Sequence, residues 1–199
     1  IVGSAAVPVI VVGNITVGGT GKTPMVIWLV EQLQRRGFTP GVVTRGYRGQ
    51  ASRAGSLVPT DGNAALYGDE AVLMRRRLQC LVAVAADRPK AVSMLIDEGC
   101  DIVVSDDGLQ HYSMERDIEI AVVDGARGLG NGRLVPAGPL REPRSRLEVV
   151  DWVVSNGCQT GLRADEIIMH AKALDFVNVA TGLALSAEDF LSKNKSVHG

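Results

Sequence analysis

The sequence lacks the cysteine pattern of a disulfide scaffold or a structural metal site. Its three cysteines, Cys80, Cys100 and Cys158, are odd in number, widely separated and without a C-x-x-C pair. We therefore expect reduced thiols that lie in the core of a protein from a cytosolic compartment.

The sequence also has little net charge and no long apolar run. A formal net charge of -1 gives no electrostatic reason to expect a nucleic-acid partner. No run reaches the roughly 18 apolar residues of a membrane-spanning helix. No Asn-Lys-x-Asp motif occurs, which argues against a GTPase. With 199 residues and 46% hydrophobic content, the chain suits one α/β domain with a full core, or one domain plus a fragment.

One stretch, Val9 to Leu33, organises the rest of the chain. A β-branched run leads into a glycine-rich turn that ends in Gly21-Lys22-Thr23 and opens onto a helical pattern. This is the context of a phosphate-binding P-loop, in which glycines let backbone N–H groups converge on an anion. A glycine turn that merely joins strand to helix is the alternative, and Lys22-Thr23 argue against it.

The loop departs from G-x-x-x-x-G-K-[ST] at its first position, where Thr16 replaces glycine. The doublet Gly18-Gly19 is expected to form the turn instead. A related loop, found in dimeric partitioning and metal-insertion ATPases, carries an additional lysine where this chain has Val17. A P-loop ATPase switch of that type is therefore the second candidate, and Val17 argues against it.

Carboxylates and basic residues follow later apolar runs. Strands are expected at 41–44, 81–85, 101–105, 119–123 and 151–155, with helices after the loop and at 71–78 and 89–97. Asp106-Asp107 ends one strand, where P-loop enzymes hold Mg²⁺, although turns also commonly carry Asp. Asp69 is placed to cap the helix at 71–78, and this is the favoured role for an isolated Gly-Asp-Glu. Residues 51–66 are predicted to form a long mobile loop, and 125–143 an extended loop.

The order of these elements predicts the fold class. Strands that alternate with helices indicate an α/β, doubly wound, mostly parallel sheet with its active edge at the carboxyl ends of the strands. The last part of the chain gives weaker signals, namely short strands within 167–177 and a short helix at 187–191. We expect a P-loop domain over 1–160, followed by short strands and a linker over 161–199.

Several separate motifs occur in one order between about Val7 and Asn156: VGNITVGGTGKTP, TRGYRG, GDEAVL, VSDDGLQHY, RDIEI and GNGRLVPAGPLREP. Together they resemble the tetraacyldisaccharide 4′-kinase family, the lipid A 4′-kinases of Gram-negative bacteria. The resemblance implies Mg²⁺-dependent transfer of the γ-phosphate of ATP to the 4′-hydroxyl of an acylated glucosamine disaccharide 1-phosphate. The product would be lipid IVA, formed at the cytoplasmic face of the inner membrane.

The resemblance also implies roles for individual residues. Lys22 would stabilise the transferring phosphoryl group, Thr23 would ligate Mg²⁺, and Asp106 and Asp107 would form the acidic pair at the metal. Asp69 becomes the catalytic base instead of a helix cap. The implied ATP loop consists of Thr16, Val17, Gly18, Gly19, Thr20, Gly21, Lys22 and Thr23. Further family positions near the phosphates are Arg45, Arg88, Gln110, His111, Arg141 and Glu142.

Two parts of the family pattern fall outside these 199 residues. The family's catalytic aspartate works with a histidine in a C-terminal domain, and an N-terminal hydrophobic segment anchors the family to the membrane. The first residue here is not methionine, so we expect a segment of a longer protein. Alone, it is expected to bind ATP with little or no kinase activity and to reach the membrane surface only through segments outside it.

Overall fold

The computed structural model describes residues 7–47, 49–172, 175–177, 181 and 183–193. Contacts divide the chain into two units, residues 1–169 and 170–199. The elements of the larger unit are β1 (Val9–Gly13), α1 (Lys22–Arg35), β2 (Pro40–Thr44), the 3-10 helix η1 (Gln50–Arg53), β3 (Ser56–Leu57), α2 (Ala64–Tyr67), α3 (Asp69–Leu78), β4 (Leu81–Val84), α4 (Arg88–Asp97), β5 (Ile102–Asp106), β6 (Ile118–Asp124), α5 (Arg146–Val149), β7 (Trp152–Asn156) and β8 (Ile167–Met169).

The smaller unit is an antiparallel pair of strands followed by a helix. Strands β9 (Asp175–Val177) and β10 (Ala184–Ser186) pair, and α6 (Ala187–Lys193) follows directly. The rings of Phe176 and Phe190 stack with centroids 4.2 Å apart. The expected short strands and terminal helix of this region are therefore present, and β8 pairs with β7 in the larger unit.

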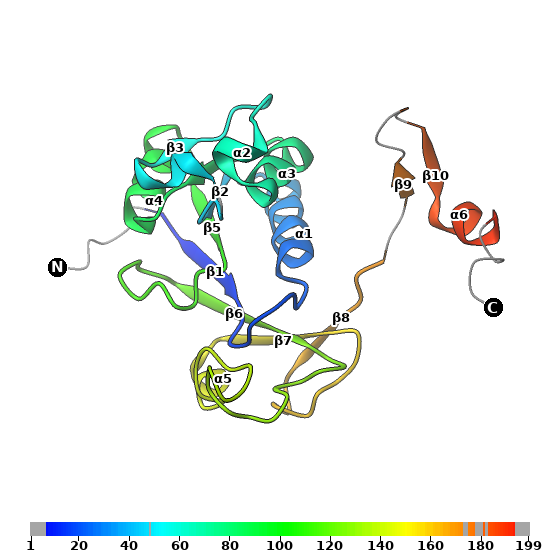
Figure 1. Cartoon of the computed structure of the whole chain (residues 1–199). Helices are drawn as coiled ribbons and strands as arrows, with labels where there is room; N and C mark the ends of the chain where they lie inside the picture. Colours follow the sequence, from blue (N-terminus) through cyan, green and yellow to red (C-terminus); the bar gives the residue numbers. More distant parts are fainter. Residues whose placement is uncertain (1–6, 48, 173–174, 178–180, 182, 194–199) are drawn as a thin grey trace. The chain divides into compact units, whose positions relative to one another are not determined.

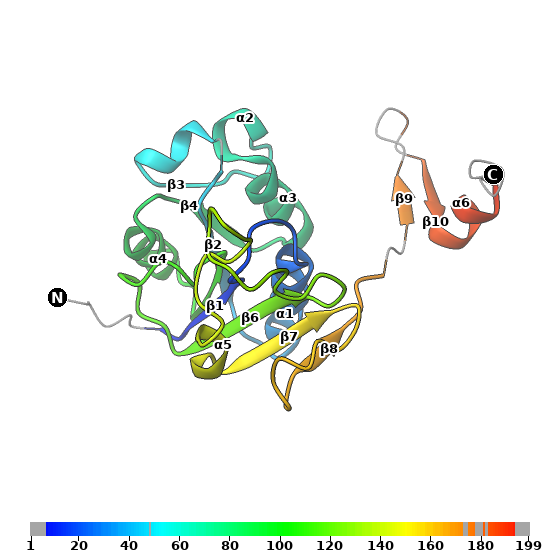
Figure 2. The ribbon, with the colours of Figure 1, turned by 60° about the horizontal axis from the view of Figure 1, so that its bottom comes forward.

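The larger unit is built on one eight-stranded sheet in the order β3-β4-β2-β5-β1-β6-β7-β8. Every pairing is parallel except that of the short edge strand β3 with β4. Figure 2 shows β6, β7 and β8 continuing the sheet beyond β1. This confirms the predicted doubly wound, mostly parallel α/β fold.

Helices cover both faces of the sheet and create two cores (Figure 1). Side chains of β1 alternate between them, because successive strand residues point to opposite faces. Val9 and Val11 pack in the cluster that contains Leu95 of α4. Ile10 and Val12 pack in the cluster that contains residues of α1 and α3. Strand β1 is fully buried, which explains its continuous apolar sequence.

Strand order and register bring the two informative motifs together. The chain runs from β1 to β2 on one side of the sheet and to β6 and β7 on the other, so β1 stands where the order reverses. Ligands of open α/β sheets bind at this position, outside the carboxyl ends of the strands. Val12 is paired with Asp106, which places the end of β5 beside the start of the glycine-rich loop.

Two expectations are corrected by the structure. Residues 51–66 are not one long mobile loop, because η1, β3 and α2 lie in or overlap them and β3 extends the sheet. Cys158 is exposed, whereas Cys80 and Cys100 are buried as expected. The expected extended loop at 125–143 contains neither a helix nor a strand, apart from isolated bridges at Leu134 and Leu140.

Within the described residues, no helix combines the length and the apolarity needed to cross a bilayer.

Candidate functional site

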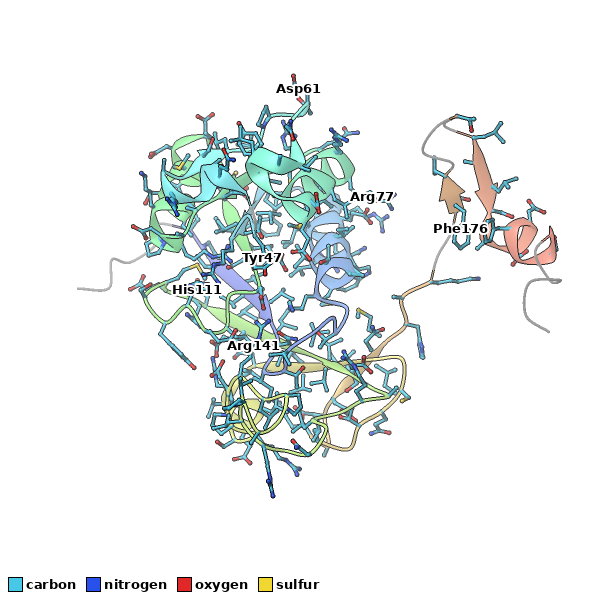
Figure 3. All side chains as sticks on the ribbon, in the orientation of Figure 1. Tyr47, Asp61, Arg77, His111, Arg141 and Phe176 are labelled. Carbon is cyan, nitrogen blue, oxygen red and sulfur yellow. The ribbon has the colours of Figure 1, made fainter. Side chains whose placement is uncertain are left out.

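A cavity of about 730 Å³ lies at the carboxyl ends of the central strands. Its lining combines glycines of the loop after β1 with charged side chains that follow β2, β5 and α2. Figure 3 labels Tyr47, His111 and Arg141, which lie near one another in this part of the molecule. The full lining is Gly18, Gly19, Lys22, Thr44, Arg45, Gly46, Tyr47, Gly68, Asp69, Glu70, Ala71, Arg88, Asp106, Asp107, Gln110, His111 and Arg141.

The glycine-rich loop adopts its turn at Gly18 and Gly21, whose φ angles are 96° and 97°. These are left-handed values that glycine adopts without steric cost. Thr16 forms an antiparallel bridge with Leu140 and has no positive φ. Glycine is therefore not required at position 16, because the left-handed φ angles occur at Gly18 and Gly21. The predicted turn at the doublet Gly18-Gly19 is confirmed at Gly18, whereas Gly19 has no positive φ.

Lys22 opens α1 and reaches across to the end of β5. Its Nζ lies 3.4 Å from Asp107 Oδ1 and donates to Asn14 Oδ1 at 3.1 Å. Arg141 Nη1 donates to both carboxylate oxygens of Asp107 at 3.1 Å. Burial raises the pKa of Asp107, but Lys22 and Arg141 outweigh it and hold this pKa below its ordinary value. Asp107 is thus ionised, and two cations gather beside the loop.

Asp106 lies deeper and has a different electrostatic environment. Its side chain is buried, and Thr44 Oγ1 donates to Oδ2 at 3.4 Å. Burial, then Glu70 and Asp107, raise its pKa to about 6. Its Oδ1 has no hydrogen-bond partner among the described residues. An unpaired oxygen on a buried carboxylate that lines a cavity indicates a missing partner, such as a cation or a water molecule.

The oxygen-rich end of the cavity fits Mg²⁺. Among the described residues, no three histidine, cysteine, aspartate or glutamate side chains gather closely enough to hold a metal ion. Mg²⁺ in phosphoryl-transfer enzymes is held by one or two carboxylates together with phosphate oxygens and waters. Asp106, with its unpaired Oδ1, and Asp107 fit that requirement. Thr23 is in the first turn of α1 but not among the lining residues, so its role as a metal ligand stays a prediction.

Arg88 is a second buried charge at this end of the cavity. Only 1% of its surface is exposed, and Nη2 donates to the backbone oxygen of Asp106 at 3.0 Å. Burial lowers its pKa to about 10, against the opposing effect of Asp106. Its Nε and Nη1 have no partner among the described residues. Because Arg88 also lines the cavity, these free donors suit an anionic ligand.

Asp69 and Glu70, at the start of α3, also line the cavity. Asp69 is the first residue of α3, and Gly68, not Asp69, is its N-cap residue. The capping role that the isolated motif favoured is therefore wrong, since α3 has no side-chain cap hydrogen bond. Both carboxylates line the cavity, and Glu70 acts on the pKa of Asp106. Asp69 thus lines the cavity and does not cap α3.

The remaining predicted residues divide into two groups. Arg45, Gln110 and His111 line the cavity. Burial, then Arg88 and Arg45, lower the pKa of His111, so the imidazole is neutral near pH 7. Glu142 does not line the cavity.

The Glu142 carboxylate is instead the centre of a polar network behind the site. It accepts hydrogen bonds from Gln110 Nε2 at 2.5 Å and from the Tyr112 hydroxyl, and it pairs with Arg146. Thr16, Val17, Thr20 and Gly21 also do not line the cavity, although they belong to the loop.

Sequence reasoning missed two residues that the structure places at the site. Asn14 is fully buried directly after β1 and binds the Lys22 ammonium. Glu70 lines the cavity, although the sequence analysis singled out only its neighbour Asp69. Asn14 could have been found from its position, since it lies between a buried strand and the glycine-rich loop. Nothing in the sequence distinguished the orientation of Glu70 from that of Asp69.

The sequence model of the family described as "Tetraacyldisaccharide-1-P 4′-kinase" matches residues 2–196. This chain belongs to that family. A tetraacyldisaccharide 4′-kinase of Tolumonas auensis is 56% identical over 178 residues, which cover 89% of this chain and 54% of the relative. One from Coxiella burnetii is 53% identical over 174 residues, which cover 85% of this chain and 52% of the relative. The chain thus spans about half the length of the curated relatives it matches.

Solved structures agree with this family assignment. The crystal structure of the Aquifex aeolicus family member, determined in complex with ATP, matches with a TM-score of 0.71 at 29% identity. The match covers 83% of this chain and 54% of that one. A signal recognition particle 54 kDa protein from Aeropyrum pernix matches with a TM-score of 0.52 at 15% identity, covering 85% of this chain and 43% of that protein. This second likeness shows a shared fold.

Proposed function

We propose that the natural protein containing this chain is an ATP-dependent kinase. It transfers the γ-phosphoryl group to the 4′-hydroxyl of a tetraacylated glucosamine disaccharide 1-phosphate. Family membership supports this activity, as does one geometric observation. Lys22 of the loop and Arg141 both bind Asp107, in the same cavity that Asp69 lines.

The donor end of the cavity supplies positive charge. The N–H groups of the glycine-rich loop and the Lys22 ammonium bind the phosphates, and Arg88 and Arg141 offer further donors. Phosphoryl transfer spreads negative charge over the γ-phosphate oxygens, so these cations stabilise the transition state more than the ground state. Mg²⁺, when held by Asp106 and Asp107 with Thr23, would add charge stabilisation at the same oxygens.

The acceptor end requires a base, because a sugar hydroxyl is a weak nucleophile. The Asp69 carboxylate accepts the proton of the 4′-hydroxyl as that oxygen forms its bond to the γ-phosphorus. The bond between this phosphorus and the β,γ-bridging oxygen breaks, and ADP leaves with that oxygen. The acceptor carries four acyl chains, so we propose that the reaction takes place at a membrane surface, the cytoplasmic face of the inner membrane.

The test is transfer of labelled phosphate from ATP to the lipid acceptor by the natural full-length protein. Wild-type protein is expected to form the 4′-phosphorylated product. Lys22→Ala should reduce the rate by at least about 100-fold while the protein stays folded, because a preorganised charge at the transferring group is lost. Rapid ATP hydrolysis that needs dimerisation but no lipid would instead favour the ATPase switch.

A further inference from the structure

Three successive carbonyl groups of the glycine-rich loop are each bound by a side chain from a different strand end. Asn14 Nδ2, after β1, donates to Gly18 O at 3.4 Å. Arg127 Nη2, three residues after β6, donates to Gly19 O. Asn156 Nδ2, at the end of β7, donates to Thr20 O at 3.3 Å.

Two of these side chains lie directly against the glycines that make the turn. A Cβ atom at Gly18 would lie 3.1 Å from Arg127 Nη1, and one at Gly21 would lie 2.6 Å from Asn156 Nδ2. The positive φ favours glycine at both positions, and at Gly21 the close approach of Asn156 also excludes a larger residue. Any other residue at Gly21 would displace the Asn156 amide.

The two outer side chains are themselves held in place. Arg127 Nε donates to Asp124 Oδ2 at 2.7 Å, and Asp124 Oδ1 accepts the Ala126 and Arg127 N–H groups at 3.0 Å. Asn156 is paired with Asp124 across β6 and β7. The two donors thus share one rigid base at the carboxyl ends of neighbouring strands.

The direction of these carbonyls decides what the loop can bind. A phosphate-binding loop presents backbone N–H groups to the anion, and a peptide carbonyl turned toward the same anion would repel it. Each bound carbonyl fixes the orientation of the N–H group that follows it in the same peptide plane. Asn14 adds a second effect, because its Oδ1 accepts from Lys22 Nζ at 3.1 Å.

We infer that Asn14, Arg127 and Asn156 are positioning residues that preorganise the loop for polyphosphate. They bind the carbonyls of Gly18, Gly19 and Thr20. The N–H groups that follow these carbonyls, those of Gly19, Thr20 and Gly21, are therefore oriented before ATP binds. Preorganisation of this kind increases affinity by removing the entropic cost of ordering the loop on binding. The inference rests on the proposed function, since it assumes that the loop binds ATP.

The test compares ATP binding and kinetics in the natural full-length protein carrying Asn156→Ala or Met169→Ala. Met169 Cε lies 3.1 Å from the same Gly21 Cβ position, so Met169→Ala removes packing there without removing a hydrogen bond. We expect Asn156→Ala to raise both the Kd and the KM for ATP about tenfold, from a hydrogen bond of ordinary strength. Its kcat should stay within about threefold of wild type, and Met169→Ala should match wild type in all three constants.

The role of Arg127 is tested with two variants, one that removes the positive charge and one that retains it. Arg127→Gln should weaken ATP binding about tenfold, whereas Arg127→Lys, which keeps a charged donor, should recover most of the affinity. Arg144→Gln is the matched control, because it removes the same charge from an exposed arginine outside the cavity lining.

Two results would overturn the inference while leaving the proposed function standing. One is wild-type ATP affinity in Asn156→Ala and Arg127→Gln. The other is an equal loss in Met169→Ala, which would assign the effect to packing. Absence of ATP binding by wild-type protein would instead refute the proposed function. If Asn156→Ala does not fold, Asn156→Ser replaces it, and the Arg127 variants are judged by the same criteria.

Discussion

Lys22 and Asp107 form an ion pair that joins the start of α1 to the end of β5, with Nζ 3.4 Å from Oδ1. The same carboxylate binds Arg141, which belongs to the extended loop at 125–143. Three segments that are far apart in the sequence thus meet at one carboxylate. Without a ligand the two cations share this single carboxylate. A bound polyphosphate would have to compete with Asp107 for Lys22 and Arg141, and Mg²⁺ would have to compete with those two cations for Asp107.

Asp107→Asn tests that arrangement. The amide keeps the shape but removes the charge that Mg²⁺ requires, so kcat is expected to fall at least about 100-fold. Because Asp107 is 36% exposed, screening limits its contribution, and the free energy of unfolding should change by less than about 1 kcal/mol. Steady-state phosphotransfer and thermal unfolding check both parts. A kcat within tenfold of wild type would remove Asp107 from the metal site.

Asp69→Asn tests the choice of base between two neighbouring carboxylates. A lost general base reduces kcat by roughly 100- to 10,000-fold, and we expect this loss in Asp69→Asn. Glu70→Gln, on the same cavity wall, is the matched control and should have a much smaller effect. Lipid phosphorylation rates at saturating ATP give the comparison. The opposite order of effects would assign the base to Glu70.

Asp106 should make the metal-free protein less stable as the pH rises. Its pKa is raised to about 6 in the folded state, above the ordinary value of 3.8, so the folded state binds the proton more tightly than the unfolded state. Stability therefore decreases between about pH 4 and pH 6 and stays reduced above that, by about 3 kcal/mol for a shift of this size.

Asp106→Asn should remove this decrease. Its unfolding temperature, measured without metal or nucleotide, is expected to exceed that of wild type at pH 7.5 and to approach it near pH 4. Phosphotransfer by the same variant should be lost, because the amide removes the negative charge proposed to hold Mg²⁺. The variant would thus gain stability at the expense of function. A variant that is less stable than wild type at pH 7.5 would contradict the assigned cost of burying this carboxylate.

The three cysteines should react at different rates with a thiol reagent. Burial raises the pKa of Cys80 to about 12, and burial likewise raises that of Cys100. The thiolate is the reactive form, so both should be inert in the folded protein, whereas exposed Cys158 should react. Titration with a chromogenic disulfide should give one equivalent before denaturation and three after it. Rapid reaction of all three would indicate that the core opens readily.

The sequence was most informative where one local pattern combined several signals. The strand, glycine turn, Lys-Thr pair and helix between Val9 and Leu33 predicted a P-loop, and the structure contains that succession. Buried parallel strands were readable because both faces are covered, which makes their sequences continuously apolar. The loop at 51–66 was misjudged because two- and four-residue elements carry too little periodicity to detect.

The role of Asp69 shows the opposite case. In a Gly-Asp-Glu motif before a helix, the aspartate can act as the N-cap residue, and aspartate is among the residues preferred at that position. The structure gives the N-cap position to Gly68 and turns Asp69 toward the cavity. Likewise, Glu142 carried no local sign that its carboxylate would bind Gln110 and Tyr112 behind the cavity. Such assignments depend on which distant segments pack together.

By itself, the sequence determined the buried central strands and the longer helices α1, α3 and α4, because hydrophobic periodicity and the positions of glycine and proline are local signals. It also determined the chemistry of the loop and the carboxylates that end β5. The tertiary structure alone decided which groups face each other: Asp107 between Lys22 and Arg141, Asp106 in a buried site beside Arg88, and three side chains on the loop carbonyls. These relations follow from strand order and register, which no local sequence pattern encodes. The distances between the charged groups and their burial then determine the protonation state of each carboxylate.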